Sequence, residues 1–232
     1  QAQTSRIITN AHRINRGQMP DLSNGRESDF FFLEQENPEE AAKEIVNLVR
    51  NRLPSHYRVP GSKIQVLSPM QRGAVGAANL NLLLQEAVNP GEICLRRGGF
   101  RFKTRDKVMQ IRNNYEKEVF NGDIGIIESI QPEDGELTVN FEGKRFSYDT
   151  AELDELVLAY AVTIHKSQGS EYPIVVMPIL MSHYVMLQRN LVYTGVTRAK
   201  KVLVIVGTKK ALALAVRNST VRKRNTLLAE RI

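Results

Sequence analysis

Two continuous apolar runs constrain the fold of this chain most strongly. Residues 175–180 read Val-Val-Met-Pro-Ile-Leu, and residues 202–206 read Val-Leu-Val-Ile-Val. Strands of this kind are buried on both faces, which happens in parallel sheets that are covered by helices on each side. The two runs therefore predict central strands of an α/β fold, with a helix between them through Leu187, Leu191 and Val196.

The first hundred residues predict the same alternation of helix and strand. An apolar stripe over residues 4–16 predicts a helix, and residues 30–33 predict a short buried strand. The next helix should begin at Asn37, because Asn caps a helix, Pro fits its first turn, and two acids face its positive end. A strand over 64–67 and a helix over 80–84 continue the pattern.

The middle of the chain has a different pattern. The turn signals Asn-Gly, Asp-Gly and Glu-Gly occur at 121–122, 134–135 and 142–143, about ten residues apart. Short alternating apolar runs lie around them, at Ile124 and Ile126, at Leu137, Val139 and Phe141, and at Phe146 and Tyr148. Such spacing predicts a small all-β barrel over residues 101–156, inserted into an α/β domain made of residues 1–100 and 157–232.

Composition excludes several other classes of protein. The single cysteine, Cys94, rules out an internal disulfide and a Cys-rich zinc site, which favours a reducing, cytoplasmic setting. No apolar run approaches 18 residues, so we expect no transmembrane helix and no membrane partner. The chain opens on Gln1 without a basic or apolar leader, so we expect no signal peptide and a piece of a longer protein.

The charge is distributed unevenly along a chain whose 32 bases and 25 acids give a net charge of +7. Seven acids lie within residues 27–44, and seven bases lie within residues 96–112. Between Glu171 and Glu230 the ten charged residues are all basic: Arg189, Arg198, Lys200, Lys201, Lys209, Lys210, Arg217, Arg222, Lys223 and Arg224. Such a stretch favours a polyanionic partner, although a solvated basic face is the simpler alternative.

Three polar segments beside the predicted strands could carry chemistry. Residues 163–171 precede a core strand, and we expect them at the carboxyl edge, where α/β sheets bind ligands. Residues 192–200 carry Arg198, whose guanidinium could bind a phosphate with two hydrogen bonds. Residues 66–73 join a strand to a helix N-terminus, which also suits a phosphate. Taken singly, a lone histidine is more typical of a structural role and a lone arginine of the surface, and the third segment is also typical of a capping turn.

Taken together and in order, these segments resemble known motifs. TIHKSQGSEYPIVV resembles motif V of superfamily 1 helicases, and LVYTGVTRAKK resembles motif VI. VLSPMQRGAVGAANLN, DKVMQIRNNYEKEVFNGDIGII and QAQTSRIITNAHRINRG resemble segments of the RecD-like branch, the relatives of the exodeoxyribonuclease V alpha subunit. The resemblance covers nearly the whole chain. It implies the second RecA-like motor domain of a P-loop NTPase, a parallel sheet with an inserted SH3-like β-barrel.

The resemblance also implies a role for each matched residue. Arg198 corresponds to the motif VI arginine that reaches the γ-phosphate of ATP from across the cleft between two motor domains. The motif V positions beside the nucleotide correspond to Gln168, Gly169 and Glu171. Contacts with single-stranded DNA are implied for Thr163, His165 and Lys166 and, more weakly, for Ser68 and Arg72.

Two nucleotide-binding elements are missing from this sequence. It contains no G-x-x-x-x-G-K-[ST] loop, and no apolar strand ends in Asp-Glu. The phosphate-binding loop and the Mg²⁺ ligands are therefore expected upstream in the same protein. We expect ATP and Mg²⁺ as cofactors of the whole protein, no metal ligand in this chain, and no ATP hydrolysis by this chain alone.

The predicted function is that of the C-terminal half of an ATP-dependent DNA helicase, which moves 5′ to 3′ if it follows the RecD-like branch. Its predicted partners are single-stranded DNA and the upstream RecA-like domain, with nuclease or helicase subunits as further candidates. The alternative is a non-catalytic module with a helicase-derived fold that binds nucleic acid or docks a partner. Within motor enzymes, a conjugative relaxase-helicase is the second choice.

Overall fold

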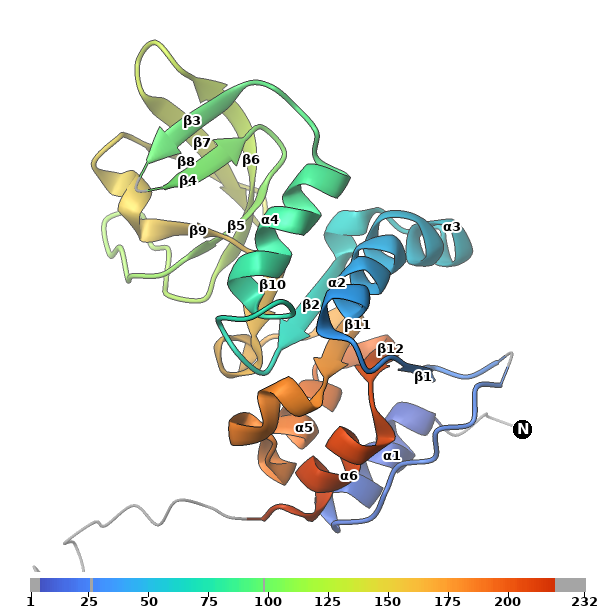
Figure 1. Ribbon diagram of the computed structural model, residues 1–232. Coiled ribbons are helices and arrows are strands. Elements are labelled where there is room, and N and C mark those ends of the chain that lie inside the picture. The colour runs from blue at the N-terminus through green and yellow to red at the C-terminus, as the bar shows by residue number, and fades with distance from the viewer. Residues whose placement is uncertain (1–4, 26, 98, 220–232) are drawn as a thin grey trace, which may run out of the picture.

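The core of the protein is a five-stranded parallel sheet (Figure 1), and the computed structural model describes residues 5–25, 27–97 and 99–219. The strand order is β1-β12-β11-β2-β10. The bounds are Phe30–Glu34 for β1, Ile64–Ser68 for β2, Ala161–Thr163 for β10, Tyr172–Ile179 for β11 and Ala199–Gly207 for β12. The two apolar runs form β11 and β12 in the middle of the sheet, which confirms the α/β prediction.

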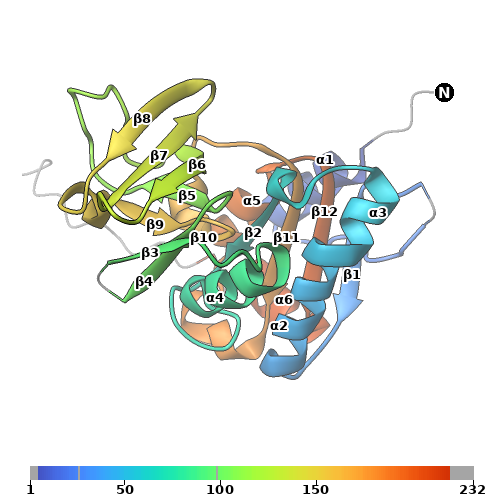
Figure 2. The same ribbon diagram turned by 90° about the horizontal axis from the view of Figure 1, so that it is seen from above.

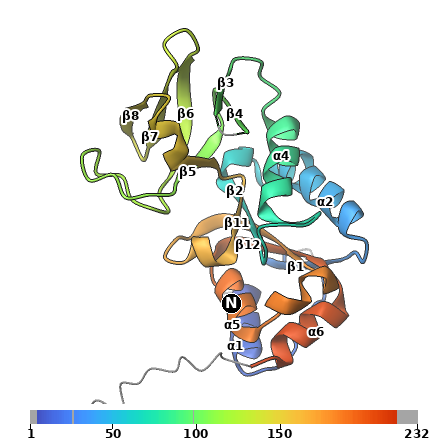
Figure 3. The same cartoon turned by 60° about the vertical axis from the view of Figure 1, so that its left-hand side comes forward.

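Helices cover both faces of this sheet, as the hydrophobic pattern requires (Figure 3). One face packs against α1 (Arg6–Asn15), α5 (Arg189–Val196) and α6 (Lys209–Arg217). The other face packs against α2 (Pro38–Asn47), a π-helical turn η1 (Leu48–Arg52), α3 (Leu53–Tyr57) and α4 (Ala77–Val88). No helix within the described ranges is long and apolar enough to cross a membrane.

The start of α2 shows how neighbouring residues determine where a helix begins. The side chain of Asn37 accepts a hydrogen bond from the Glu40 amide at 2.9 Å, and Pro38 occupies the first helical position. Both features satisfy or remove amide groups that have no partner inside the helix. The predicted helix start is confirmed.

The SH3-like barrel lies between α4 and β10 in the chain. Its main sheet is antiparallel, in the order β8-β7-β6-β5-β9, and a hairpin of β3 and β4 packs beside β6. The bounds are Cys94–Arg97 for β3, Phe100–Lys103 for β4, Lys107–Gln110 for β5, Ile124–Gln131 for β6, Glu136–Phe141 for β7, Lys144–Tyr148 for β8 and Leu156–Leu158 for β9. Short 3-10 helices complete the chain at Gly61–Lys63 (η2), Glu152–Glu155 (η3), Ile164–Ser167 (η4) and Met181–Met186 (η5).

The barrel sits beside β10, at the opposite end of the sheet from β1 (Figure 2). Strand β9 leads through Ala159 and Tyr160 directly into β10, so the two units share a short connection. This arrangement places the barrel next to the residues that follow β10, which are the first of the predicted site.

Two local predictions differ from the structure. The helix N-terminus expected within residues 66–73 begins only at Ala77, because residues 69–76 form a turning loop that ends at Gly76, the N-cap of α4. In β6 the fully buried positions are Gly125 and Ile127, whereas Ile124 and Ile126 are only half-buried.

Candidate nucleotide and nucleic-acid interface

Residues 163–171 carry most of the predicted site. In the structure they run from the carboxyl edge of the sheet to its amino edge. Thr163 ends β10 at the carboxyl edge, where it pairs with Ser68 of β2. The chain then passes through η4, and β11 begins at Tyr172. Because β10 and β11 both run parallel to β2, which lies between them, the chain must return to the amino edge. The prediction of a carboxyl-edge site is therefore wrong for residues 170 and 171, which directly precede β11.

Arg198 lies at this amino edge, between the end of α5 and the start of β12. Its guanidinium donates from Nη1 to the Ser170 carbonyl at 3.0 Å, from Nε to the Thr194 carbonyl at 3.2 Å and from Nη2 to the Thr197 hydroxyl at 3.2 Å. The backbone adds a bond from the Tyr172 amide to the Arg198 carbonyl at 2.8 Å. Three bonds leave two of the five N–H groups of a guanidinium for a ligand. The pairing of β11 with β12 thus brings the two helicase-like motifs together.

Glu171 contributes charge beside this arginine. Its carboxylate forms an ion pair with Lys200 at 2.8 Å, and both side chains are largely exposed. The hydrogen bond and positive charge of Lys200, with a smaller effect from Arg198, hold the pKa of Glu171 below its ordinary value. The turn before it contains exposed Gln168 and Gly169, whose φ of 87° is a left-handed conformation that glycine adopts at little cost. The structure therefore brings Ser170 and Glu171 next to Arg198 at the amino edge, and Gln168 and Gly169 lie in the turn that leads there.

The residues implied in DNA contact lie at the other, carboxyl edge. The Thr163 hydroxyl accepts a hydrogen bond from the Lys166 amide at 3.4 Å and so caps η4. His165 and Lys166 are exposed on this short helix, and Arg72 is exposed on the neighbouring loop of residues 69–76. Three of these four side chains can donate to a phosphate from solvent-facing positions.

Ser68 has a different place from the one expected of a DNA contact. It is fully buried, and its hydroxyl lies 2.8 Å from the Val75 carbonyl and 3.0 Å from the Met70 carbonyl. These two hydrogen bonds connect the Ser68 hydroxyl to both ends of the loop of residues 69–76 on its buried side. Ser68 therefore positions the loop that presents Arg72 and does not itself reach the surface.

A cavity of about 210 Å³ opens where the carboxyl edge meets the barrel. Thr163, Lys166 and Gln71 line it from the parallel sheet and its loop, and Met109 and Val157 line it from the barrel. Gln71 was not singled out from the sequence, although it lies next to Arg72 in the quoted segment VLSPMQRG. Two of the predicted DNA contacts, Thr163 and Lys166, thus face the barrel across a shared cavity.

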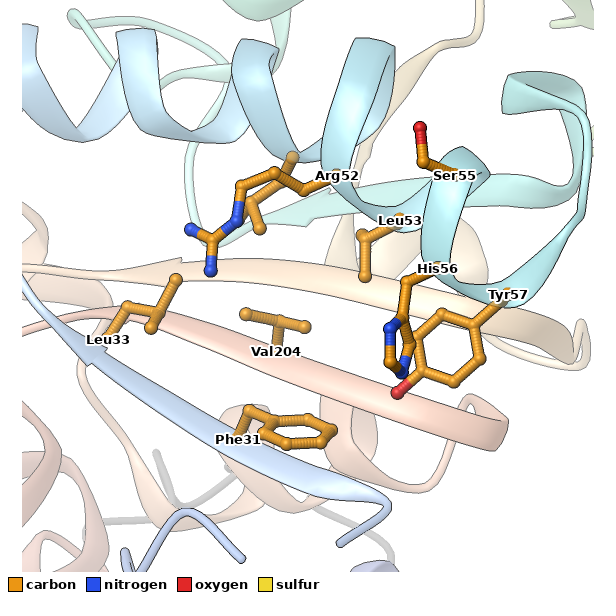
Figure 4. Close-up of a pocket in the computed structure, with 9 residues that line it drawn as sticks. Phe31, Leu33, Arg52, Leu53, Ser55, His56, Tyr57 and Val204 are labelled. Atoms are coloured by element: carbon orange, nitrogen blue, oxygen red, sulfur yellow. The ribbon is translucent and has the colours of Figure 1, made fainter. Parts of the chain in front are cut away.

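A second cavity, of about 510 Å³, lies at the far end of the sheet (Figure 4). The side chains of Phe31, Leu33 and Val204 rise from the sheet toward Arg52 and His56, which come from η1 and α3. None of the predicted site residues lines this cavity.

Within the described ranges, no group of three or more His, Cys, Asp or Glu side chains could hold a metal ion. Three of the ten bases that follow Glu171 in the sequence, Arg222, Lys223 and Arg224, lie outside the described residues.

Comparison with known proteins identifies the family. Residues 80–141 match a family described as the ATP-dependent RecD-like DNA helicase SH3 domain, and residues 158–206 match the UvrD-like helicase C-terminal domain. The whole chain is 36% identical over 232 residues to the ATP-dependent RecD2 DNA helicase of Deinococcus radiodurans. The chain belongs to the RecD-like helicase family. It spans 31% of the length of that relative.

Other relatives of this RecD-like chain agree with the assignment. It is 29% identical over 166 residues to the RecBCD enzyme subunit RecD of Haemophilus influenzae, covering 72% of this chain and 25% of that subunit. A solved structure of the Pif1 helicase from Bacteroides, in complex with ADP-AlF3 and ssDNA, matches with a TM-score of 0.56 at 15% identity. That match covers all of this chain and 54% of the Pif1 chain, and it shows a shared fold.

Proposed function

We propose that this chain is the second motor domain of a RecD-like, ATP-dependent DNA helicase, which grips single-stranded DNA and supplies an arginine to the ATP site. The proposed domain division is residues 1–100 and 157–232 for the RecA-like unit and residues 101–156 for the SH3-like barrel. The DNA substrate and the bacterial relatives support a cytoplasmic location.

One contact carries this proposal. The Arg198 guanidinium donates to the Ser170 carbonyl, which belongs to the same short segment as Thr163, His165 and Lys166. If Arg198 moves toward a bound phosphate, its hydrogen bond to Ser170 therefore also displaces the segment that faces DNA. Such a link between an arginine and a DNA-facing loop is what a motor needs to convert events at ATP into movement along a strand.

The chemistry of phosphoryl transfer suits the proposed role of Arg198. Negative charge on the transferred phosphoryl group is stabilised by a guanidinium placed against its oxygens, which contributes about 10³–10⁵ in rate. The two N–H groups of Arg198 outside its internal bonds could make that contact. ATP is proposed to bind mainly on another domain of the longer protein, and the proposal assigns no magnesium ligand to this chain.

The decisive experiment measures ATP hydrolysis stimulated by single-stranded DNA in the full-length protein. We expect Arg198→Ala to lower turnover by about three orders of magnitude while DNA binding persists. Arg217→Ala, an exposed arginine of α6, is the matched control and should retain turnover. Equal turnover in wild type and Arg198→Ala would refute the finger role.

A second measurement uses the 232-residue chain by itself. We expect no ATP hydrolysis above background, because the sequence contains no phosphate-binding loop of the G-x-x-x-x-G-K-[ST] type. Strong DNA-stimulated turnover by this chain would contradict the split of the ATP site between two domains. If the full-length wild-type protein shows no ATP turnover, a non-catalytic module that binds nucleic acid is favoured.

The 5′ to 3′ direction of movement is proposed from the family alone.

A further inference from the structure

A buried carboxylate joins the barrel to the parallel sheet, and it lies outside the segments that resemble motifs V and VI. Asp106 is fully buried, just before β5. Its Oδ1 accepts hydrogen bonds from Asn89 Nδ2 at 2.7 Å and from the Tyr160 hydroxyl at 2.9 Å. Its Oδ2 accepts from Gln85 Nε2 and from the Lys103 amide, the latter at 2.7 Å. One carboxylate therefore ties together α4 and its C-terminal end, the β4–β5 turn, and the connection to β10.

The same joint also holds the beginning of β10. Asn81 of α4 donates to the Ala161 carbonyl at 2.7 Å and accepts from the Ala161 amide at 2.9 Å. Gln65 of β2 donates to the Ala159 carbonyl at 3.1 Å and to the Tyr160 carbonyl at 3.2 Å. All of these contacts are buried, so the backbone of residues 159–161 is fixed from α4, from β2 and from Asp106.

Thr163 follows this fixed backbone after one residue. A strand advances about 3.3 Å per residue, so Thr163 lies roughly 7 Å beyond Ala161 along a stiff, extended backbone. Thr163 in turn caps η4, the helix that carries His165 and Lys166. Movement of the barrel against α4 would therefore shift the DNA-facing segment.

We propose that Asp106 and Tyr160 are positioning residues that hold the barrel and the Thr163 segment as one rigid unit on single-stranded DNA. This inference rests on the proposed function, because it assigns the unit a role in gripping the strand. The barrel and the segment would then keep a fixed spacing along the strand while Arg198 responds to ATP at the other edge of the sheet.

The chain offers a matched pair of substitutions to test this. Tyr160→Phe removes the one hydrogen bond that links Asp106 to the β10 connection and leaves its other three donors in place. Tyr148→Phe removes a comparable buried bond, from the Tyr148 hydroxyl to Gln110 Oε1 at 3.0 Å, which lies inside the barrel. Both variants lose one buried hydroxyl, so a general loss of stability should affect them alike.

The activity measurement uses the full-length protein. We expect Tyr160→Phe to raise the single-stranded DNA concentration for half-maximal ATP hydrolysis by about fivefold, and the ATP consumed per base pair unwound by a similar factor. Turnover at saturating DNA should stay within about twofold of wild type. Tyr148→Phe should leave the half-maximal DNA concentration, the ATP consumed per base pair and the turnover at saturating DNA unchanged. Unchanged values in Tyr160→Phe, or equal losses in both variants, would overturn the positioning role.

A second readout does not depend on helicase activity. Spin labels at Lys43→Cys on α2 and Glu133→Cys on the barrel, with other cysteines replaced, report the distance between the two units in the full-length protein. We expect a broader distance distribution in Tyr160→Phe and an unchanged one in Tyr148→Phe. A wild-type distribution in Tyr160→Phe would overturn the rigid joint. If wild type shows no DNA-stimulated turnover, the proposed function fails, and the distances still decide the joint.

Discussion

Lys107 illustrates at the scale of one residue how the joint between the two units shapes stability. Its ammonium group is buried, and Nζ lies 3.2 Å from the Ser62 carbonyl and 3.4 Å from the Ile64 carbonyl. Burial, with a smaller effect from the charge of Lys63, lowers the pKa of Lys107 to about 7. The folded protein therefore holds this lysine neutral over much of the range where the unfolded chain is protonated.

A pH dependence follows from that difference. Between pH 7 and about 10 the unfolded chain binds one more proton than the folded protein, so the free energy of unfolding rises with pH by up to about 1.4 kcal/mol per unit from this group. We expect Lys107→Met to be more stable near pH 7 and to lose that slope, as measured by urea unfolding at several pH values. The exposed Lys201→Met should keep the slope. An unchanged slope in Lys107→Met would show that Lys107 titrates normally.

At the scale of elements, the packing of α5 determines where Arg198 lies. Gly195 is buried in α5, and a Cβ there would lie 2.5 Å from Met177 Sδ and 3.3 Å from Ile164 Cδ1. Helix α5 can approach β11 and η4 closely only because this position lacks a side chain. Arg198 comes three residues later, so its distance from Ser170 depends on that approach.

Gly195→Ala tests this packing. We expect a loss of about 1–3 kcal/mol in the free energy of unfolding, because the added methyl group overfills the space beside Met177. The displaced helix should also reduce DNA-stimulated ATP hydrolysis by the full-length protein. Gly91→Ala, where the new Cβ would meet only Asn89 Oδ1 at 3.5 Å, should change neither quantity. Wild-type stability and turnover in Gly195→Ala would mean that the helix adjusts without moving Arg198.

At the scale of the whole molecule, bases gather where the barrel joins the sheet, although the barrel of residues 101–156 as a whole carries 13 acids and 8 bases. The acids of residues 27–44 lie on and around β1 and α2, whereas the bases of residues 96–112 lie on and around β3 to β5, beside β10 (Figure 2). Arg72, His165 and Lys166 are exposed at this junction. A polyanionic strand should therefore bind at the junction and avoid the acids of β1 and α2.

The salt dependence of binding tests this orientation. Each phosphate contact with single-stranded DNA contributes about 0.7 to the slope of log K against log salt concentration. Arg72→Ala and Lys166→Ala should each lower the slope by about that amount in the full-length protein. Lys43→Ala on the acidic α2 is the matched control and should leave the slope unchanged. A flat salt response in wild type would argue against electrostatic binding of the strand.

Much of the fold could be predicted because it depends on local pattern. The buried runs of β11 and β12, the capped start of α2 and the turns of the barrel each follow from neighbouring residues. In β6 the pattern pointed to the wrong face, because Gly125 faces Val139 and Phe141 at a distance that excludes a side chain. A glycine carries no hydrophobic signal, so this inward position could not be read from the sequence.

The joint between the barrel and the parallel sheet was harder to predict. Asp106 is the one acid among the seven bases of residues 96–112, which is a signal that it has a specific partner. Its actual donors, Gln85, Asn89 and Tyr160, lie up to 54 residues away and have no common pattern. Buried polar contacts of this kind depend on the positions of whole elements, which the sequence specifies only through the complete fold.

The sequence by itself determined the helices and strands, the order of the motifs and the family, because each rests on short stretches of chain. Only the tertiary structure decided that Thr163 and Glu171 stand at opposite edges of the sheet and that Arg198 bonds to Ser170. The physical reason is strand direction. Since β10 and β11 both run parallel to β2, the chain has to return from the carboxyl edge to the amino edge within eight residues, and pairing between strands far apart in sequence sets what meets at each edge.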